Sequence, residues 1–203
     1  VSGVIGSEVR YAVDGVETTR KSSKPFAPYI TSTLQVAASN VVGFTADRTM
    51  RTAQQLYMGL EVPGEGQIGL ITYMRTDSTT LSDTAVNAAR TQVRELYGDE
   101  YVPAEPRTYK GKSKNAQEAH EAIRPSGETF KTPDELKSEL RKDEQALYDL
   151  IWKRTVASQM EDAVGRTISM RINAEARANG ADAVTCTFGA SGRVITFPGY
   201  MRA

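Results

Sequence analysis

The sequence predicts an α+β protein in which a helical domain is inserted into a β-rich domain formed by both chain ends. Residues 1–21 are strand-like and rich in valine, tyrosine and threonine. The middle of the chain repeats its apolar residues every three to four positions, as amphipathic helices do. Alternating patterns return from about residue 167. This order, strands then helices then strands, predicts that both chain ends join one β-rich domain and that the helices form a domain between them.

Composition describes an ordinary globular chain of 203 residues with 39% hydrophobic and 25% charged residues. Lys+Arg and Asp+Glu both number 25, so net charge gives no support for a nucleic-acid or membrane partner. The single cysteine, Cys186, excludes an internal disulfide and is expected to be buried in a strand. We expect a cytoplasmic piece of a longer protein, because there is no initial methionine, signal peptide or membrane-spanning run.

The first strand-like segment contains Asp14-Gly15, a pair that predicts a hairpin turn. The following run "RKSSKPFAPY", residues 20–29, combines two prolines with serines and basic residues and is predicted to be a linker.

Capping residues and glycines delimit the predicted helices. They begin at Ser32 or Thr33, at Thr45 and at Ser82, and they end at Gly43, Gly59 and Gly98 respectively. The run "EVPGEGQ", residues 61–67, is predicted to be a loop.

Two further helices are expected after the turn-rich, basic residues 99–117. The motif "TPDEL" predicts a helix start at Thr132. A longer helix at about 143–160 would bury Leu147 and Ile151, with Trp152 at the edge of the buried stripe. Three strands are then predicted at 167–172, 183–188 and 193–197.

The run "GLITYMRTDST", residues 69–79, places a tyrosine two positions before an arginine. In a strand, Tyr73 and Arg75 would project to the same face. Phenols ionise only near pH ~10, but a neighbouring cation favours the phenolate. An arginine can also bind a phosphate with two hydrogen bonds. The pair therefore suits attack on a phosphodiester, although a packed tyrosine explains the same pattern.

The only histidine, His120, lies in "NAQEAHEAIRPS", residues 115–126. On a helix, His120 and Arg124 would share a face and could bind a phosphate. On spacing alone, a partly buried histidine that is hydrogen-bonded to Glu118 or Glu121 is the better explanation. No second histidine or nearby cysteine supports a metal site.

A basic run surrounds Tyr109 in the loop before His120. Its cations are Arg107, Lys110, Lys112 and Lys114. This run could follow a phosphate backbone, or it could be a solvated loop.

Four segments resemble signature sequences of the type IA DNA topoisomerases, in matching order and approximate spacing. "GLITYMRTDST" resembles the active-site segment, and "NAQEAHEAIRPS" resembles a second signature in its bacterial form. The other two are "APYITSTLQ", residues 27–35, and "LYDLIWKRTVASQM", residues 147–160. The resemblance extends over about residues 25–200.

This resemblance implies that Tyr73 attacks a phosphodiester of single-stranded DNA, forming a 5′-phosphotyrosine and freeing a 3′-hydroxyl. The other strand passes through the gap, the hydroxyl reverses the attack, and negative supercoils are relaxed. Arg75 would stabilise the phosphate and His120 would contact it. Further candidates for substrate contact or site support are Glu118, Arg124, Thr31, Ser32, Thr33, Gln35, Thr76 and Asp77.

The family's ring-shaped architecture implies a β-rich arch at 1–27 and 163–203 and a helical domain with the tyrosine at 28–162. It also implies other domains that are not recognisable in this sequence. Its acidic, magnesium-binding cluster belongs to a Toprim domain, and another domain supplies much of the single-strand groove. We therefore expect Mg²⁺ to act in the full-length enzyme and no cofactor to bind this chain, which alone should be inactive. The expected partners are single-stranded DNA and those domains, with no membrane and with a dimer of the chain as an option. The implied location is the bacterial cytoplasm, in association with the nucleoid.

Two interpretations compete with the enzyme. A non-catalytic module could bind single-stranded DNA on the same scaffold, although the presence of both Tyr73 and Arg75 argues against it. A protein-interaction platform would show no salt-dependent binding of single-stranded DNA. Within the family, reverse gyrase shares these motifs.

Overall fold

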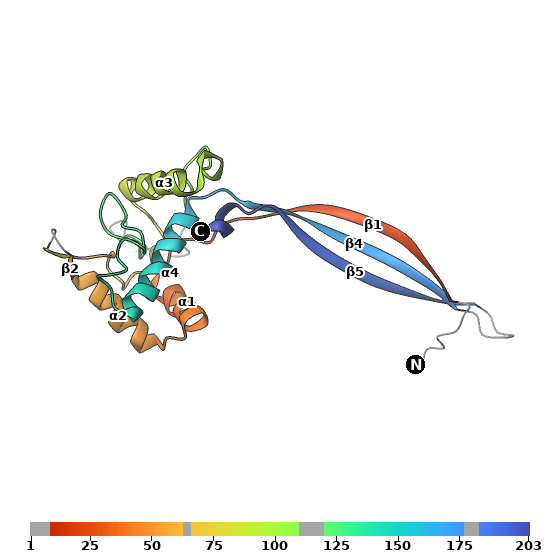
Figure 1. Cartoon of the computed structure of the whole chain (residues 1–203), viewed down its shortest axis with the longest axis horizontal. Coiled ribbons are helices and arrows are strands. Elements are labelled where there is room, and N and C mark those ends of the chain that lie inside the picture. Colours follow the sequence, from red (N-terminus) through yellow and green to blue (C-terminus); the bar gives the residue numbers. More distant parts are fainter. Residues whose placement is uncertain (1–8, 63–65, 110–119, 177–182) are drawn as a thin grey trace. The chain divides into compact units, whose positions relative to one another are not determined.

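The computed structural model describes residues 9–62, 66–109, 120–176 and 183–203. The chain divides into two compact units, of which the first contains Val1–Ser23 and Ala163–Pro198. The second contains Lys24–Asp162 and Gly199–Ala203. One unit is built on strands and the other on helices (Figure 1), which confirms the predicted mixture of helix and sheet. None of the described helices is long and apolar enough to cross a membrane.

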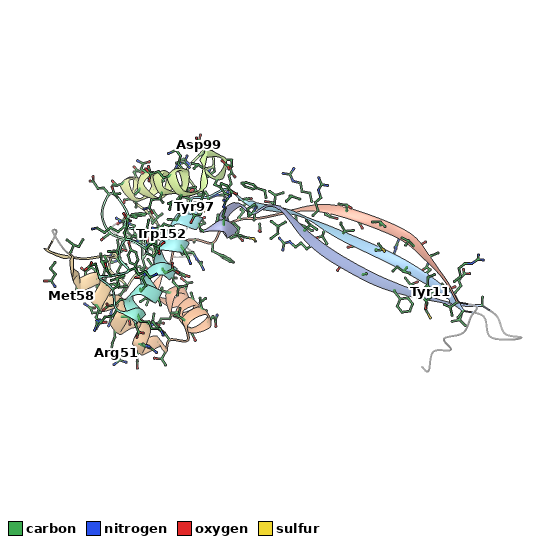
Figure 2. All side chains as sticks on the ribbon, in the orientation of Figure 1. Tyr11, Arg51, Met58, Tyr97, Asp99 and Trp152 are labelled. Atoms are coloured by element: carbon green, nitrogen blue, oxygen red, sulfur yellow. The ribbon has the colours of Figure 1, made fainter. Side chains whose placement is uncertain are left out.

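The sheet unit is a three-stranded antiparallel sheet with the order β1-β4-β5 (Figure 1). Its strands are β1 Val9–Ser23, β4 Ala163–Ala176 and β5 Val184–Phe197. Most of its side chains are exposed, including that of Tyr11, which Figure 2 labels.

The predicted hairpin at Asp14-Gly15 is wrong. Strand β1 continues through this pair, and its register against β4 shifts between Val13 and Gly15. The shift is a β-bulge, which accommodates one extra residue without reversing the chain. The Asp14 carboxylate lies 3.6 Å from Nε of Arg171 on the neighbouring strand.

The two strands predicted after residue 182 are a single strand, β5. Gly189 and Gly192 remain paired with Arg171 and Ile168 of β4, so the glycines do not interrupt the strand. Cys186 was expected to be buried but is exposed. The reason is that side chains are exposed along nearly the whole of β5.

The helical unit contains four α-helices, two 3₁₀ turns and a short hairpin in its described part. The helices are α1 Thr31–Val42, α2 Ala46–Met58, α3 Asp83–Tyr97 and α4 Lys142–Ser158. The other elements are β2 Leu60–Val62, β3 Gly66–Ile68, η1 Asp99–Tyr101 and η2 Gly199–Arg202.

The structure confirms most of the predicted helix ends. Thr45 and Ser82 accept hydrogen bonds from the first turns of α2 and α3. The predicted glycines end α1, α2 and α3, and Gly43 adopts a left-handed conformation with φ 71°. Helix α1 begins earlier than predicted, at Thr31, because the Thr33 hydroxyl accepts a hydrogen bond from the Ile30 N–H.

Helices α1, α2 and α3 each contact α4, and the core lies along these contacts. It includes Leu34, Ala53, Leu56, Val93, Leu147 and Ile151. Trp152 was predicted at the edge of this core but is buried (Figure 2), because its indole N–H donates to Gln92 Oε1 at 2.7 Å. Tyr57 in α2 and Leu96 in α3 lie outside this core and are 39% and 50% exposed.

Two local predictions are corrected by the structure. At the ends of the predicted loop at 61–67, Glu61 and Val62 pair with Gln67 and Gly66 in β2-β3, while residues 63–65 lie outside the described residues. Residues 20–23 of the predicted linker belong to β1, and Pro25 and Tyr29 are buried.

The helix predicted at Thr132 is replaced by turns. Its capping signal forms, because the Thr132 N–H donates to Glu135 Oε2 and the Glu135 N–H donates to Thr132 Oγ1. The next helix begins at residue 142, however, and so short a segment leaves little room for a helix to propagate.

Candidate active site

The segment that carries the predicted nucleophile pairs with the segment that carries the histidine. We call residues 69–80 the tyrosine segment and residues 120–126 the histidine segment. An antiparallel bridge joins Ile71 to Pro125. Three hydrogen bonds continue the pairing: Thr72 N–H to Arg124 O (2.9 Å), Thr72 Oγ1 to Ala122 O (2.7 Å) and Ser126 N–H to Leu70 O (3.0 Å).

The start of α1 is bonded to both segments. Tyr29 forms a bridge with Ile123, whose N–H donates to the Tyr29 carbonyl at 2.8 Å. The Thr31 hydroxyl donates to the Met74 carbonyl at 2.8 Å and accepts from the Thr76 N–H at 2.9 Å. The Thr31 N–H donates to the Thr76 carbonyl at 3.0 Å. The tyrosine segment is therefore held on both sides of Tyr73.

Helix α4 reaches the same region through Arg154. Its guanidinium lies 4.3 Å from the centre of the Tyr29 ring and 3.3 Å from the Tyr29 hydroxyl. Burial raises the pKa of Tyr29, although the neighbouring Arg154 acts against this shift. All four segments that resemble the family signatures thus contribute to one network.

Tyr73 and Arg75 are presented at the surface of this network. Both side chains are exposed, Tyr73 by 48%, whereas Met74 between them is 1% exposed. This alternation is what the sequence predicts for a strand, although regular pairing here is limited to the bridge at Ile71. The Arg75 side chain forms no hydrogen bond or ion pair with any other residue that the structure describes, so its charge is available for an anion.

The structure corrects the proposed helix around His120. Residues 120–126 are extended and bridged rather than helical. His120 and Arg124 therefore do not share a helical face. His120 is exposed, and the described contacts do not join its ring to Tyr73 or Arg75.

Arg124 supports the backbone of the site and is not a free cation. Its side chain is 11% exposed and binds Glu121 at 2.6 Å and the Pro125 carbonyl at 2.8 Å. Glu121 also accepts from the Ser82 N–H at the start of α3, at 2.7 Å. Burial favours a higher pKa for the Glu121 carboxyl, but its bonds to Arg124 and Ser82 hold that pKa below the usual value.

The remaining predicted residues occupy different positions around the network. Ser32 is exposed and Gln35 half-buried in the first turns of α1, while Asp77 is exposed after the tyrosine pair. Thr76 contributes through its backbone, and its hydroxyl accepts from the Ser78 N–H at 3.1 Å. Glu118 lies outside the described residues.

The predicted basic run is only partly described. Lys110, Lys112 and Lys114 lie outside the described residues. Arg107 is bonded to Asp162 at 2.6 Å, and the Tyr109 hydroxyl donates to the Ser158 carbonyl at 2.8 Å. Burial raises the pKa of Tyr109 to about 12. These two side chains are therefore part of the packed structure rather than an exposed track.

Sequence reasoning missed two residues that hold the site together, Thr72 and Glu121. Glu121 had a local signal, because it stands between His120 and Arg124 and three residues before an arginine. Thr72 had none, since it bonds to a segment 50 residues away. Thr31 lies in a segment that resembles a family signature, but its partners, 43 and 45 residues away, could not be predicted.

The described residues do not provide a magnesium site. Over 9–62, 66–109, 120–176 and 183–203, no group of three or more histidine, cysteine, aspartate or glutamate side chains could hold a metal ion. The acidic residue within the histidine segment, Glu121, is already bonded to Arg124 and Ser82. Hard cations such as Mg²⁺ need several free oxygen ligands, so the residues present do not fit one.

Comparison with known proteins agrees with this network of signatures. A family model described as DNA topoisomerase matches residues 4–203. The chain is 54% identical to DNA topoisomerase 1 of Mycolicibacterium smegmatis, over 100% of this chain and 20% of that protein. It is also 54% identical to DNA topoisomerase 1 of Streptomyces coelicolor, over 96% of this chain and 19% of that protein.

Solved structures include a similar fold. Full-length topoisomerase I from Thermotoga maritima matches with a TM-score of 0.76 and 37% identity, over 95% of this chain and 29% of that one. The chain thus spans about one fifth of the length of the curated relatives above. Because the family model covers nearly the whole chain, this chain belongs to the DNA topoisomerase family.

Proposed function

We propose that this chain supplies the nucleophile of a type IA DNA topoisomerase, with Tyr73 attacking single-stranded DNA. The observation that carries the proposal is the half-exposed Tyr73 phenol on a segment that two other signature segments hold by hydrogen bonds. A nucleophile must be accessible to its substrate and must be fixed in position. Tyr73 meets the first condition through its exposure and the second through its backbone.

The proposed reaction exchanges one phosphodiester for another. Tyr73 Oη loses its proton and forms a bond to phosphorus, while the bond from phosphorus to the 3′-oxygen breaks. The leaving oxygen takes a proton and becomes a free 3′-hydroxyl. That hydroxyl later attacks the phosphotyrosine and releases Tyr73, so no external energy source is required.

Two cationic or polar side chains can assist in defined ways. The exposed Arg75 guanidinium can bind a non-bridging phosphate oxygen and stabilise charge in the transition state. The exposed His120 can contact the same phosphate once DNA spans both segments. Arg124 and Glu121 would keep the histidine segment in place, since they bind each other and α3.

We place Mg²⁺ in other domains of the full-length protein. Such an ion would position or stabilise the phosphate there, and no step above depends on it. Strand passage, relaxation of negative supercoils and binding to Toprim and groove domains also belong to that longer protein.

A covalent trapping experiment on the full-length protein tests this proposal. Single-stranded oligonucleotides labelled at either the 3′ or the 5′ end are incubated with the protein and denatured. The 3′ label should migrate with the protein, because the 5′-phosphate of the downstream product is attached to Tyr73. The 5′ label should appear in a shortened free oligonucleotide.

Substitution separates the nucleophile from its surroundings. Tyr73→Phe should abolish the adduct, whereas Tyr97→Phe, at the end of α3, should retain it. An adduct of undiminished yield with Tyr73→Phe would overturn the proposal. Salt-dependent binding of single-stranded DNA without any adduct in the parent would favour the non-catalytic module instead.

A further inference from the structure

The ring of Tyr57 contacts the ring of Tyr73. Tyr57 lies in the last turn of α2, and the two ring centroids are 5.3 Å apart with an angle of 66° between the planes. This is the edge-to-face arrangement that aromatic pairs prefer. Helical periodicity predicts an inward Tyr57, yet its side chain is 39% exposed and faces the tyrosine segment instead.

The backbone fixes the place where these rings meet. The Leu70 N–H donates to the Leu56 carbonyl at 2.8 Å, so the tyrosine segment crosses the end of α2 one residue from Tyr57. A Cβ at Gly69 would lie 2.7 Å from the Tyr57 carbonyl oxygen. The crossing is therefore too close for any side chain at residue 69, and Tyr57 stays near Tyr73.

A half-exposed phenol needs such a neighbour if it is to react efficiently. An unrestrained tyrosine samples several staggered rotamers. In-line attack requires the oxygen to lie about 3–3.5 Å from phosphorus with correct alignment. Over the described ranges of the chain, the Tyr73 hydroxyl has no hydrogen-bond partner. Within the same ranges, Tyr57 is the one aromatic residue whose ring contacts the Tyr73 ring.

We propose that Tyr57 is a positioning residue, whose ring restricts the Tyr73 side chain to the rotamer that reacts. The inference rests on the proposed function of Tyr73 as nucleophile. Tyr57 acts through its ring, because no described residue is hydrogen-bonded to its hydroxyl. It takes no proton and forms no bond to DNA.

Single-turnover cleavage by the full-length protein tests this role. Excess protein is mixed with 3′-labelled single-stranded DNA at saturating concentration, and adduct formation is timed. Tyr57→Ala and Tyr57→Leu should slow adduct formation by about 3- to 10-fold, the range expected for one aromatic contact. Tyr57→Phe keeps the ring and should remain within about twofold of the parent.

The dissociation constant for the same DNA, measured with Tyr73→Phe as background, should change by less than about twofold in each Tyr57 variant. Tyr97→Ala is the matched control, since Tyr97 also lies in the last turn of a helix and pairs with another ring, that of Tyr101. Figure 2 labels Tyr97 beside α3, and this control should cleave at the parent rate. Tyr57→Leu carries the test if Tyr57→Ala does not fold.

Three results would overturn the inference. Cleavage at the parent rate by Tyr57→Leu would show that the ring is dispensable. Equal loss in Tyr57→Phe would assign the effect to the hydroxyl. Loss confined to the dissociation constant would make Tyr57 a DNA contact. An adduct that survives Tyr73→Phe contradicts the proposed function itself and is observed independently of the Tyr57 variants.

Discussion

At the scale of single residues, one hydroxyl organises the backbone around the proposed nucleophile. Thr31 Oγ1 donates to the carbonyl of Met74, the residue after Tyr73. It also accepts from the N–H of Thr76, the residue after Arg75. The Thr31 side chain is half-buried, so losing its hydroxyl would leave backbone groups without their partner.

Thr31→Val should lower the free energy of unfolding by about 1–3 kcal/mol, because valine keeps the shape but satisfies neither backbone group. Chemical denaturation of the purified chain measures the change. Thr33→Val is the matched control: the Thr33 hydroxyl bonds only to exposed groups of Ile30 and should matter less. Equal losses in the two variants would contradict the special role of Thr31.

Glu121 predicts a dependence of stability on pH. Burial favours a raised pKa, but the bonds to Arg124 and Ser82 dominate and lower the pKa from 4.5 in the folded chain. The carboxylate therefore stabilises the fold above pH 4.5, and this contribution is lost as pH falls through the lowered value.

Glu121→Gln should accordingly destabilise the chain more at pH 7 than at pH 3, as measured by urea denaturation at both values. The exposed Glu95 provides the control, and Glu95→Gln should alter stability little at either pH. A Glu121→Gln penalty that is independent of pH would show that shape, not charge, is what Glu121 contributes.

At the scale of secondary-structure elements, the end of α2 determines where the tyrosine segment lies. Gly59 ends the helix with φ +97°, and a Cβ there would lie 2.6 Å from the Ile68 carbonyl oxygen. Gly69 crosses the same turn next to the Tyr57 carbonyl. The two glycines together permit a close crossing, which brings Tyr57 and Tyr73 into contact.

Gly69→Ala should lower the free energy of unfolding by about 1–3 kcal/mol, since the added methyl meets backbone that must shift. It should also slow adduct formation in the full-length protein by displacing Tyr73 from Tyr57. Gly189→Ala, where a Cβ meets nothing within 4 Å, should be nearly neutral in the same denaturation assay. Neutral behaviour of Gly69→Ala would show that the crossing can widen without cost.

At the scale of the whole molecule, the two units of this chain match only part of much longer relatives. Its curated relatives have about five times the length matched here, since the chain covers 20% of the Mycolicibacterium smegmatis protein. The described residues include the proposed nucleophile but no side-chain group suited to a divalent metal. We therefore expect this chain to depend on other domains for activity.

The isolated 203-residue chain should not relax supercoiled plasmid in the presence of Mg²⁺, even at high protein concentration. Agarose gel electrophoresis measures relaxation, and the full-length protein is the positive control. Adding the missing domains as a separate polypeptide should restore the covalent adduct but not in a Tyr73→Phe chain. Relaxation by the isolated chain would contradict this dependence.

The sequence by itself determined the family and the helix ends at Thr45, Ser82, Gly43 and Gly98. It also determined the coarse order of the chain, in which strands at both ends flank a helical middle. These features depend on local chemistry: capping hydroxyls, flexible glycines and short motifs. The roles of Tyr73, Arg75 and His120 remain predictions from the motifs.

Only the tertiary structure decided features that depend on partners distant in sequence. It showed a bulge rather than a turn at Asp14, because β4 continues to pair on both sides of it. It also paired the histidine segment with the tyrosine segment instead of forming a helix around His120. Thr31, Glu121 and Tyr57 gained their positions in the same way. Groups that meet in space from residues far apart in sequence, such as Thr72 and Ala122 at a separation of 50 residues, carry no periodic signal in the chain.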